Sequence, residues 1–216
     1  LFVDKIIEHS IYPLWSPRGT LNMAGTGRLP LTLLLVGFAK LFALDGPTYA
    51  RLILLWITLA TYTSGFVGFS LLARWRKREA GFGNPVGALI CGVFAIVNPW
   101  TIARLEHSWL MAQWAIVPLV VATFAEGLRT DRKSWVLGSA LIMGAFGTTQ
   151  PHYLVITVGI VLLTTIVIAI SKNRSIVRTF TYCALWIAAL MCLSAHFVFP
   201  YLAAKLLAGI GDPAYT

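Results

Sequence analysis

Charged side chains are scarce in this chain, and acidic ones are the scarcest. Of its 216 residues 12% are charged and 58% are apolar, whereas soluble domains average about 25% charged residues. Eight Asp and Glu stand against 17 Lys and Arg, a net charge of +9, and the mean hydropathy is +0.78. This balance excludes an ordinary soluble domain and is typical of an integral membrane protein.

Cysteine is nearly absent too. Cys91, Cys183 and Cys192 lie inside apolar runs without metal-ligand spacing, so a disulfide framework or a zinc site is not expected. We interpret them as small core residues. No signal-peptide pattern can be read at the start, and the first residue is Leu1 rather than Met. We therefore expect the chain to be a segment of something longer.

What the chain has instead is long apolar runs separated by three short basic bands. The bands contain ten of the 17 Lys and Arg residues: Arg74, Arg76, Lys77 and Arg78; Arg129, Arg132 and Lys133; Lys172, Arg174 and Arg178. The intervening loops carry almost no positive charge, which is the positive-inside pattern. It predicts a multi-pass protein of the cell membrane with cytoplasmic basic loops. Bands at one depth favour membrane lipid as the partner and not nucleic acid.

The apolar runs predict an all-α bundle of six transmembrane helices, since about 20 apolar residues cross the hydrocarbon core. The expected spans are 48–73, 83–99, 108–127, 134–150, 152–171 and 179–203. With the bands inside, the junctions near 99–107, near 151 and after 203 are external. Residues 48–203 then form the bundle, and 204–216 an external tail from which the chain continues.

Residues 1–47 are expected to form a separate external region. Residues 2–12 alternate apolar and polar side chains with a rough helical period, as in a helix lying in the membrane interface. The apolar run 29–44 is ambiguous because it is short and contains Lys40. We favour a half-buried or re-entrant external helix, and a seventh crossing is the alternative.

This topology gathers titratable side chains on the external side, including all four histidines. The densest stretch runs from Asn98 to Trp109. In a helix, Arg104 and His107 would stand three residues apart on one face, where they can meet an anionic oxygen together. Asn98-Pro99 would end the preceding span. An arginine that reaches the interface beside a tryptophan anchor explains Arg104 equally well.

At this point the sequence resembles a known family. The interfacial helix is followed by Tyr12-Pro13 and by the stretch from Pro17 to Asn22, and Leu29-Pro30-Leu31 then opens a helix that ends before Asp45-Gly46-Pro47. Asn98-Pro99 next precedes Arg104 and His107. Over about residues 8–126 this order is similar to the N-terminal half of the GT-C superfamily of membrane glycosyltransferases, especially its large prokaryotic members. The motifs are loose, and transport proteins can imitate them.

The resemblance implies transfer of a sugar from a polyprenyl-phosphate donor to an acceptor on the external face. It implies a carboxylate base in the first external loop, and Asp4 is the first candidate here and Glu8 the second. Positive charge is needed for the departing phosphate. The candidate phosphate or substrate contacts are Arg18, Arg104, His107, Gln150 and His152. In that family the acid follows the first span, so the alternative is a base upstream of Leu1.

The cofactor is left open. Some relatives use a divalent metal, and Asp4, His9 or His152 offer ligands, but no pair has diagnostic spacing, so no metal site is assigned. The expected partners are membrane lipid, a polyprenyl-phosphate-linked sugar and other membrane proteins.

Two other classes remain open. A transporter would use Pro118, Gly138, Gly144 and Gly147 to break or closely pack its helices, although the spans contain almost no ionisable residue. A non-catalytic subunit of a larger membrane assembly is the other alternative.

Overall fold

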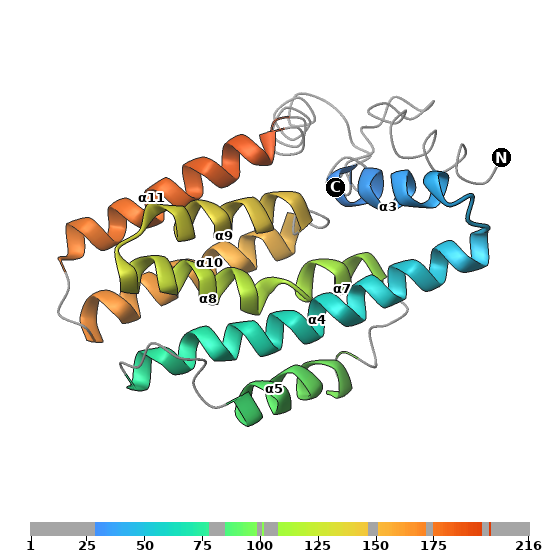
Figure 1. Ribbon diagram of the computed structural model, residues 1–216. Coiled ribbons are helices and arrows are strands. Elements are labelled where there is room, and N and C mark those ends of the chain that lie inside the picture. The colour runs from blue at the N-terminus through green and yellow to red at the C-terminus, as the bar shows by residue number, and fades with distance from the viewer. Residues whose placement is uncertain are drawn as a thin grey trace, which may run out of the picture.

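The computed structural model describes residues 29–77, 85–98, 101, 108–146, 151–171, 175–195 and 199. Over this part of the chain the protein is all-helical, which confirms the all-α part of the predicted fold class (Figure 1). The helices are α3 (Leu29–Leu41), α4 (Gly46–Lys77), α5 (Pro85–Val97), α7 (Ser108–Trp114), α8 (Val117–Thr130), α9 (Lys133–Phe146), α10 (Pro151–Ser171) and α11 (Ile176–Leu193).

Three segments are long and apolar enough to cross a membrane within the described residues. They are Gly46–Arg74, Met111–Thr130 and Ile176–Leu193. The apolar parts of α5, α9 and α10 are shorter, at 10 to 17 residues each. The helix α3 has 13 residues, which at 1.5 Å per residue is about 20 Å and less than the roughly 30 Å of hydrocarbon.

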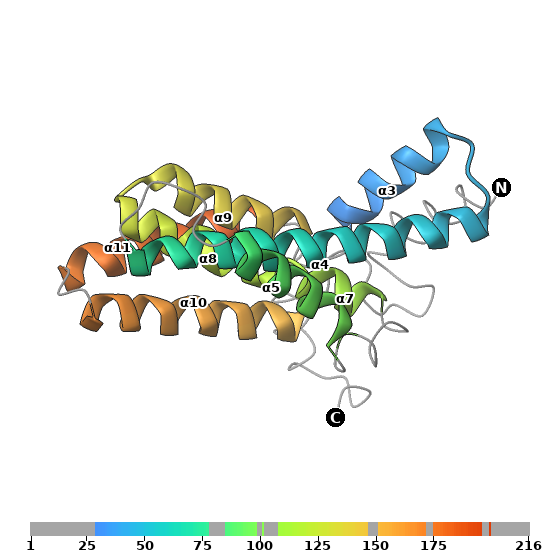
Figure 2. The ribbon, with the colours of Figure 1, turned by 60° about the horizontal axis from the view of Figure 1, so that its bottom comes forward.

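The helix α8 forms the centre of the bundle. Its residues from Ala122 to Leu128 are all buried, and it packs against α4, α9 and α10 (Figures 1 and 2). Phe124 of α8, Met143 of α9 and Trp186 of α11 are fully buried. The Phe124 and Trp186 rings meet edge to face with centroids 6.1 Å apart.

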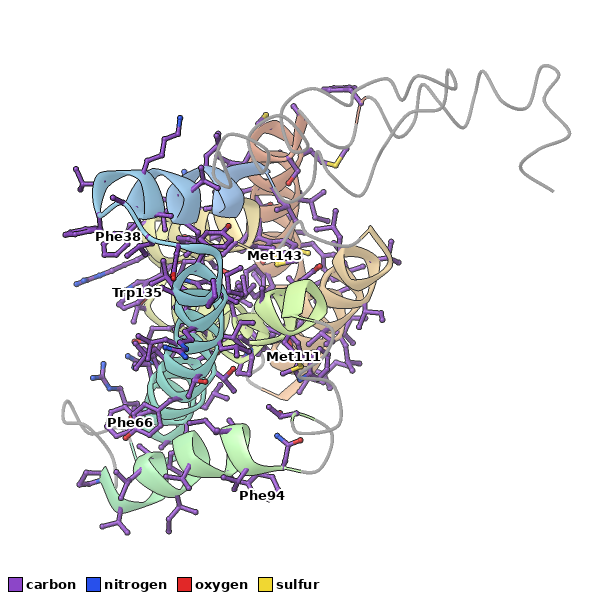
Figure 3. The ribbon with its side chains drawn as sticks, turned by 90° about the vertical axis from the view of Figure 1, so that its right-hand side faces the viewer. Phe38, Phe66, Phe94, Met111, Trp135 and Met143 are labelled. Atoms are coloured by element: carbon purple, nitrogen blue, oxygen red, sulfur yellow. The ribbon has the colours of Figure 1, made fainter. Side chains whose placement is uncertain are left out.

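The outward faces are apolar as well. Phe94 on α5 is 66% exposed, whereas Met111 and Met143 are fully buried (Figure 3). On α10, Val155, Leu163 and Ile170 are exposed. A helix with apolar side chains on both its inward and its outward face is typical of a membrane span, because lipid covers the outward face.

Small residues let α4 and α5 approach closely. A Cβ atom added to Gly65 would lie 3.0 Å from the Cys91 carbonyl oxygen and 3.2 Å from the Gly92 Cα. One added to Gly92 would lie 2.8 Å from the ring of Tyr62. Gly144 makes a similar approach between α9 and α11, where its Cβ would lie 2.7 Å from the Cβ of Leu193. In lipid the hydrophobic effect does not drive helices together, so close van der Waals contacts of this kind stabilise their association.

The predicted span 108–127 is not one regular helix. It breaks at Ala115 and Ile116, between α7 and α8, one residue before the Val117-Pro118 start of α8. Pro118 has no N–H and is tolerated in a first turn. The following N–H, of Leu119, donates to the Ser64 hydroxyl of α4 at 2.9 Å. Ser64 therefore caps α8 from another helix, which is one way that a broken membrane helix recovers its hydrogen bonds.

A tight turn joins α3 to α4. Ala43 adopts a left-handed φ of 48°, and the Leu44 N–H closes on the Ala39 carbonyl at 2.9 Å, so α3 ends as many helices do. Asp45 then caps α4 by accepting from the Thr48 N–H at 2.9 Å. The pKa of Asp45 lies below its ordinary value, chiefly because of hydrogen bonding with the Thr48 side chain and next because of this bond from the Thr48 N–H. The chain thus turns at residues 42–45, and the predicted connection is displaced, because Gly46 and Pro47 already belong to α4.

Candidate functional site

The three basic bands lie at one end of the bundle. The C-terminal end of α4, the turn between α8 and α9 and the start of α11 are all at the left in Figure 1, and Figure 2 shows the same grouping. Arg74, Arg129 and Arg178 belong to these three elements. Sequence alone predicted bands at one depth, and the described part of each band agrees with it.

The segments that carry the predicted site leave or enter the bundle at the opposite end. There α5 ends, α7 begins, α9 ends and α10 begins (Figures 1 and 2). Of the predicted site residues, those outside the described part of the chain are Asp4, Glu8, Arg18, Arg104, His107 and Gln150. The backbone of His152 lies in the first turn of α10, and its side chain is outside the described residues.

The end of α5 is built as the sequence predicts. The helix stops at Val97, and the Asn98 side chain donates to the Ala95 carbonyl at 2.8 Å and accepts from the Thr101 N–H at 3.0 Å. The Thr101 hydroxyl also donates to the Ala95 carbonyl, at 2.9 Å. Asn98 thus satisfies the helix end and the start of the segment that contains Arg104 and His107.

Asp131, Arg178 and Tyr182 form a hydrogen-bonded cluster at the basic end, which we call the polar clamp. Asp131 follows α8 with a left-handed φ of 59°, and the Arg132 N–H behind it donates to the Gly127 carbonyl at 3.1 Å. This turn aims the Asp131 carboxylate at α11. There it accepts from the Arg178 guanidinium and from the Tyr182 hydroxyl, the latter at 2.8 Å. The clamp therefore joins the α8–α9 turn to α11, about 50 residues further along the chain.

A small cleft of about 190 Å³ lies at this clamp. Its lining consists of Leu128, Asp131, Ser175, Arg178, Thr179 and Tyr182. Arg178 remains well exposed, with 64% of its side chain accessible. The cleft is thus open, and its lining combines apolar surface with charged and hydroxyl groups.

Glu126 is an ionisable residue that the sequence analysis did not single out. It is 2% exposed on α8, and its carboxylate accepts two bonds from Arg129, from Nε at 2.6 Å and from Nη2 at 2.5 Å. A bidentate partner one turn away compensates the burial of the charge. The available signal was the Glu-x-x-Arg spacing in the last turn of an apolar helix.

The described residues do not by themselves make a metal centre, since they contain no group of three His, Cys, Asp or Glu side chains placed to hold an ion. At the end opposite the bands, the described geometry supplies the ends of α5 and α9 and the starts of α7 and α10. At the basic end it supplies a formed cleft with a guanidinium and hydroxyl groups. The first arrangement can position a substrate at a membrane surface, and the second can bind an anion.

These features define an all-helical protein with helices long and apolar enough to span a membrane. Residues 14–212 match the family described as "Domain of unknown function (DUF6311)", so the chain belongs to the DUF6311 family. No curated protein and no solved structure shows a significant match to it.

Proposed function

We propose that this protein is a GT-C-like glycosyltransferase, or part of one, which transfers a sugar from a polyprenyl-phosphate donor to an acceptor on the external membrane face. In this proposal α4, α5, the α7–α8 pair, α9, α10 and α11 make six crossings. The flanking residues complete the spans of the shorter helices, and the basic bands face the cytoplasm.

The observation that carries the proposal is the common placement of four helix ends. Arg104 and His107 belong to the segment between α5 and α7, and Gln150 and His152 belong to the segment between α9 and α10. Both segments meet the bundle at the end away from the basic bands (Figure 1). Segments some 45 positions apart in sequence therefore join the bundle at the same end, which supports a shared phosphate site.

The proposed sugar transfer needs a carboxylate base and positive charge near the departing phosphate. An acceptor hydroxyl loses its proton to a carboxylate, Asp4 or Glu8 in this chain, as its oxygen bonds to the anomeric carbon of the sugar. The bond between that carbon and the phosphate oxygen breaks, and polyprenyl phosphate leaves with both electrons. Arg18, Arg104 and His107 would stabilise the negative charge that grows on that phosphate.

Lipid analysis and an activity assay together test the proposal. Mass spectrometry of the purified protein should find bound polyprenyl phosphate or its sugar ester. In membranes supplied with labelled polyprenyl-phosphate sugar, Arg104→Ala should abolish transfer without changing the helical circular dichroism.

The matched control is Arg132→Ala, which removes the same charge at the basic end and should retain transfer. Ordinary phospholipid as the sole bound lipid, together with no transfer by the wild type, would contradict the proposal and favour a structural subunit. Full turnover by Arg104→Ala would remove Arg104 from the site.

A further inference from the structure

The cleft at the basic end lies far from the segments that the proposed transfer reaction uses. It is formed where the α8–α9 turn meets the first turns of α11. We propose that this cleft binds the phosphate headgroup of an anionic phospholipid in the leaflet next to the basic bands. This binding does not depend on the proposed glycosyl transfer.

The size of the cleft fits such a group. Its volume of about 190 Å³ corresponds to roughly six water molecules at about 30 Å³ each. That is enough for a phosphate and a short polar substituent, but not for a large ligand, since drug-sized pockets measure roughly 300–1,000 Å³. The two acyl chains of a lipid would lie outside the cleft, against the bundle.

Exposed apolar side chains that could contact those chains are present on the same end of α11 as the cleft. Ile176, Val177 and Phe180, on the first turns of α11, are 64%, 78% and 44% exposed. They flank Ser175, Arg178 and Thr179 of the lining in sequence. An anionic headgroup site and an apolar strip on the same helix end are what a phospholipid needs and a soluble anion does not.

Donors in the cleft suit a phosphate oxygen. The bond from Arg178 to Asp131 uses Nη2, and a guanidinium carries five N–H donors, so further donors remain on a side chain that is 64% exposed. The Ser175 oxygen accepts from the Arg178 backbone N–H at 3.4 Å, and its own O–H is able to donate. Arginine is especially suited to phosphate because of its planar fork.

The charge around the cleft also favours an anion. Asp131 balances Arg178, and Glu126 balances Arg129. Arg132 and Lys133 follow directly and are exposed, so the described surface of this turn is left positive. Lys172 and Arg174 precede Ser175 in the sequence. Basic pockets between helices at the cytoplasmic surface are known headgroup sites.

Titration with short-chain lipids tests the proposal. The protein in an uncharged detergent is titrated with dihexanoyl phosphatidylglycerol, and native mass spectrometry counts the lipids retained per chain. We expect saturable binding of one phosphatidylglycerol. Arg178→Gln should weaken it about tenfold or more, since a charge-assisted bond contributes at least that factor.

Two further variants keep the test decisive. Arg178→Gln leaves the Asp131 carboxylate unpaired, so Asp131→Asn/Arg178→Gln is made as well, which removes both charges. It should fold with wild-type circular dichroism and still bind about tenfold more weakly. Arg51→Gln removes one exposed positive charge from α4 at the opposite end and should leave binding within about twofold of wild type.

Three results would overturn the proposal. The first is equal retention of dihexanoyl phosphatidylcholine, whose headgroup has no net charge. The second is wild-type binding by the doubly substituted protein. The third is displacement of phosphatidylglycerol by inorganic phosphate at equal concentration, which would assign the cleft to a free anion.

Discussion

The indole N–H of Trp186 on α11 donates to the hydroxyl oxygen of Ser139 on α9, at 3.1 Å. The Ser139 hydroxyl in turn donates to the Val120 carbonyl of α8 at 2.7 Å. All three residues are fully buried. One serine thus links three helices at the centre of the bundle, where neither water nor lipid can replace the bonds.

The coupling between Ser139 and Trp186 should be measurable. In a cycle of Ser139→Ala, Trp186→Phe and the double variant, we expect a coupling free energy of about 0.6 kcal/mol, the average between membrane helices, and no more than about 1.7 kcal/mol. The cycle cancels the volume lost with the indole ring. Unfolding in denaturing detergent, followed by circular dichroism, gives the four values. Additive effects would show that the bond contributes nothing net.

Alanine should have opposite effects at two glycines, one in the close contact between α4 and α5 and one in open space on α9. Gly65→Ala should destabilise the protein by about 1–3 kcal/mol, because the new Cβ meets backbone atoms that cannot move cheaply. Gly138→Ala, on α9 with no atom within 4 Å of the new Cβ, should stabilise it by about 0.4–1 kcal/mol. Thermal unfolding in one detergent compares the pair. A Gly65→Ala protein as stable as wild type would contradict the close approach.

The cap that α4 supplies to α8 predicts a difference between two buried serines. Ser64→Ala leaves the Leu119 N–H without its acceptor and should cost about 1–3 kcal/mol. Ser70 has a similar burial, but its hydroxyl donates to Phe66 of its own helix, where the carbonyl keeps its backbone bond. Ser70→Ala should therefore cost less than about 1 kcal/mol, and equal losses at the two sites would argue against interhelical capping.

Asp45 predicts a pH dependence at the start of α4. Its pKa is lowered from the ordinary value of 3.8, chiefly by the hydrogen bonds with Thr48, while desolvation opposes them and Arg51 adds a smaller favourable charge. A lowered pKa means that the ionised cap stabilises the helix above the unfolded-state pKa. That contribution is lost as the pH falls through the folded-state value.

Hydrogen exchange at the Thr48 amide measures this effect. Its protection, corrected for the intrinsic exchange rate, should be constant above about pH 5 and fall below the ordinary pKa of Asp. Asp45→Asn keeps an acceptor and should abolish the pH dependence, whereas Asp45→Ala should expose the amide at every pH. A pH-independent wild type would contradict the cap.

Sequence predicted those parts of the fold that depend on short-range signals. The basic bands, the end of α5 at Asn98-Pro99 and the turn at Asp45 all follow from hydropathy, charge or turn chemistry within a few residues. The favoured interpretation predicted one unbroken span at 108–127, and a break at Pro118 was expected only under the transporter alternative. A proline in a first turn and a proline in a kink look alike until the partner of Leu119 is known, and that partner is Ser64, 55 residues earlier.

For the candidate sites, too, the sequence predicted groupings of neighbouring residues but not contacts between distant ones. Arg104 and His107 could be grouped from their spacing, but their approach to Gln150 or His152 depends on how helices pack, and these side chains lie outside the described residues. The clamp of Asp131 with Arg178 and Tyr182 was missed because its members are about 50 residues apart. In the sequence Arg178 belongs to a basic band, and the bands were used only to predict the orientation of the helices in the membrane.

The most direct test is the sidedness of the two ends of the bundle. In a protein whose native cysteines are replaced, single cysteines at positions 77 and 107 are treated with a membrane-impermeant maleimide in intact and permeabilised cells. We predict that position 107 reacts in intact cells and that position 77 reacts only after permeabilisation. Equal labelling of both positions from one compartment would contradict the account.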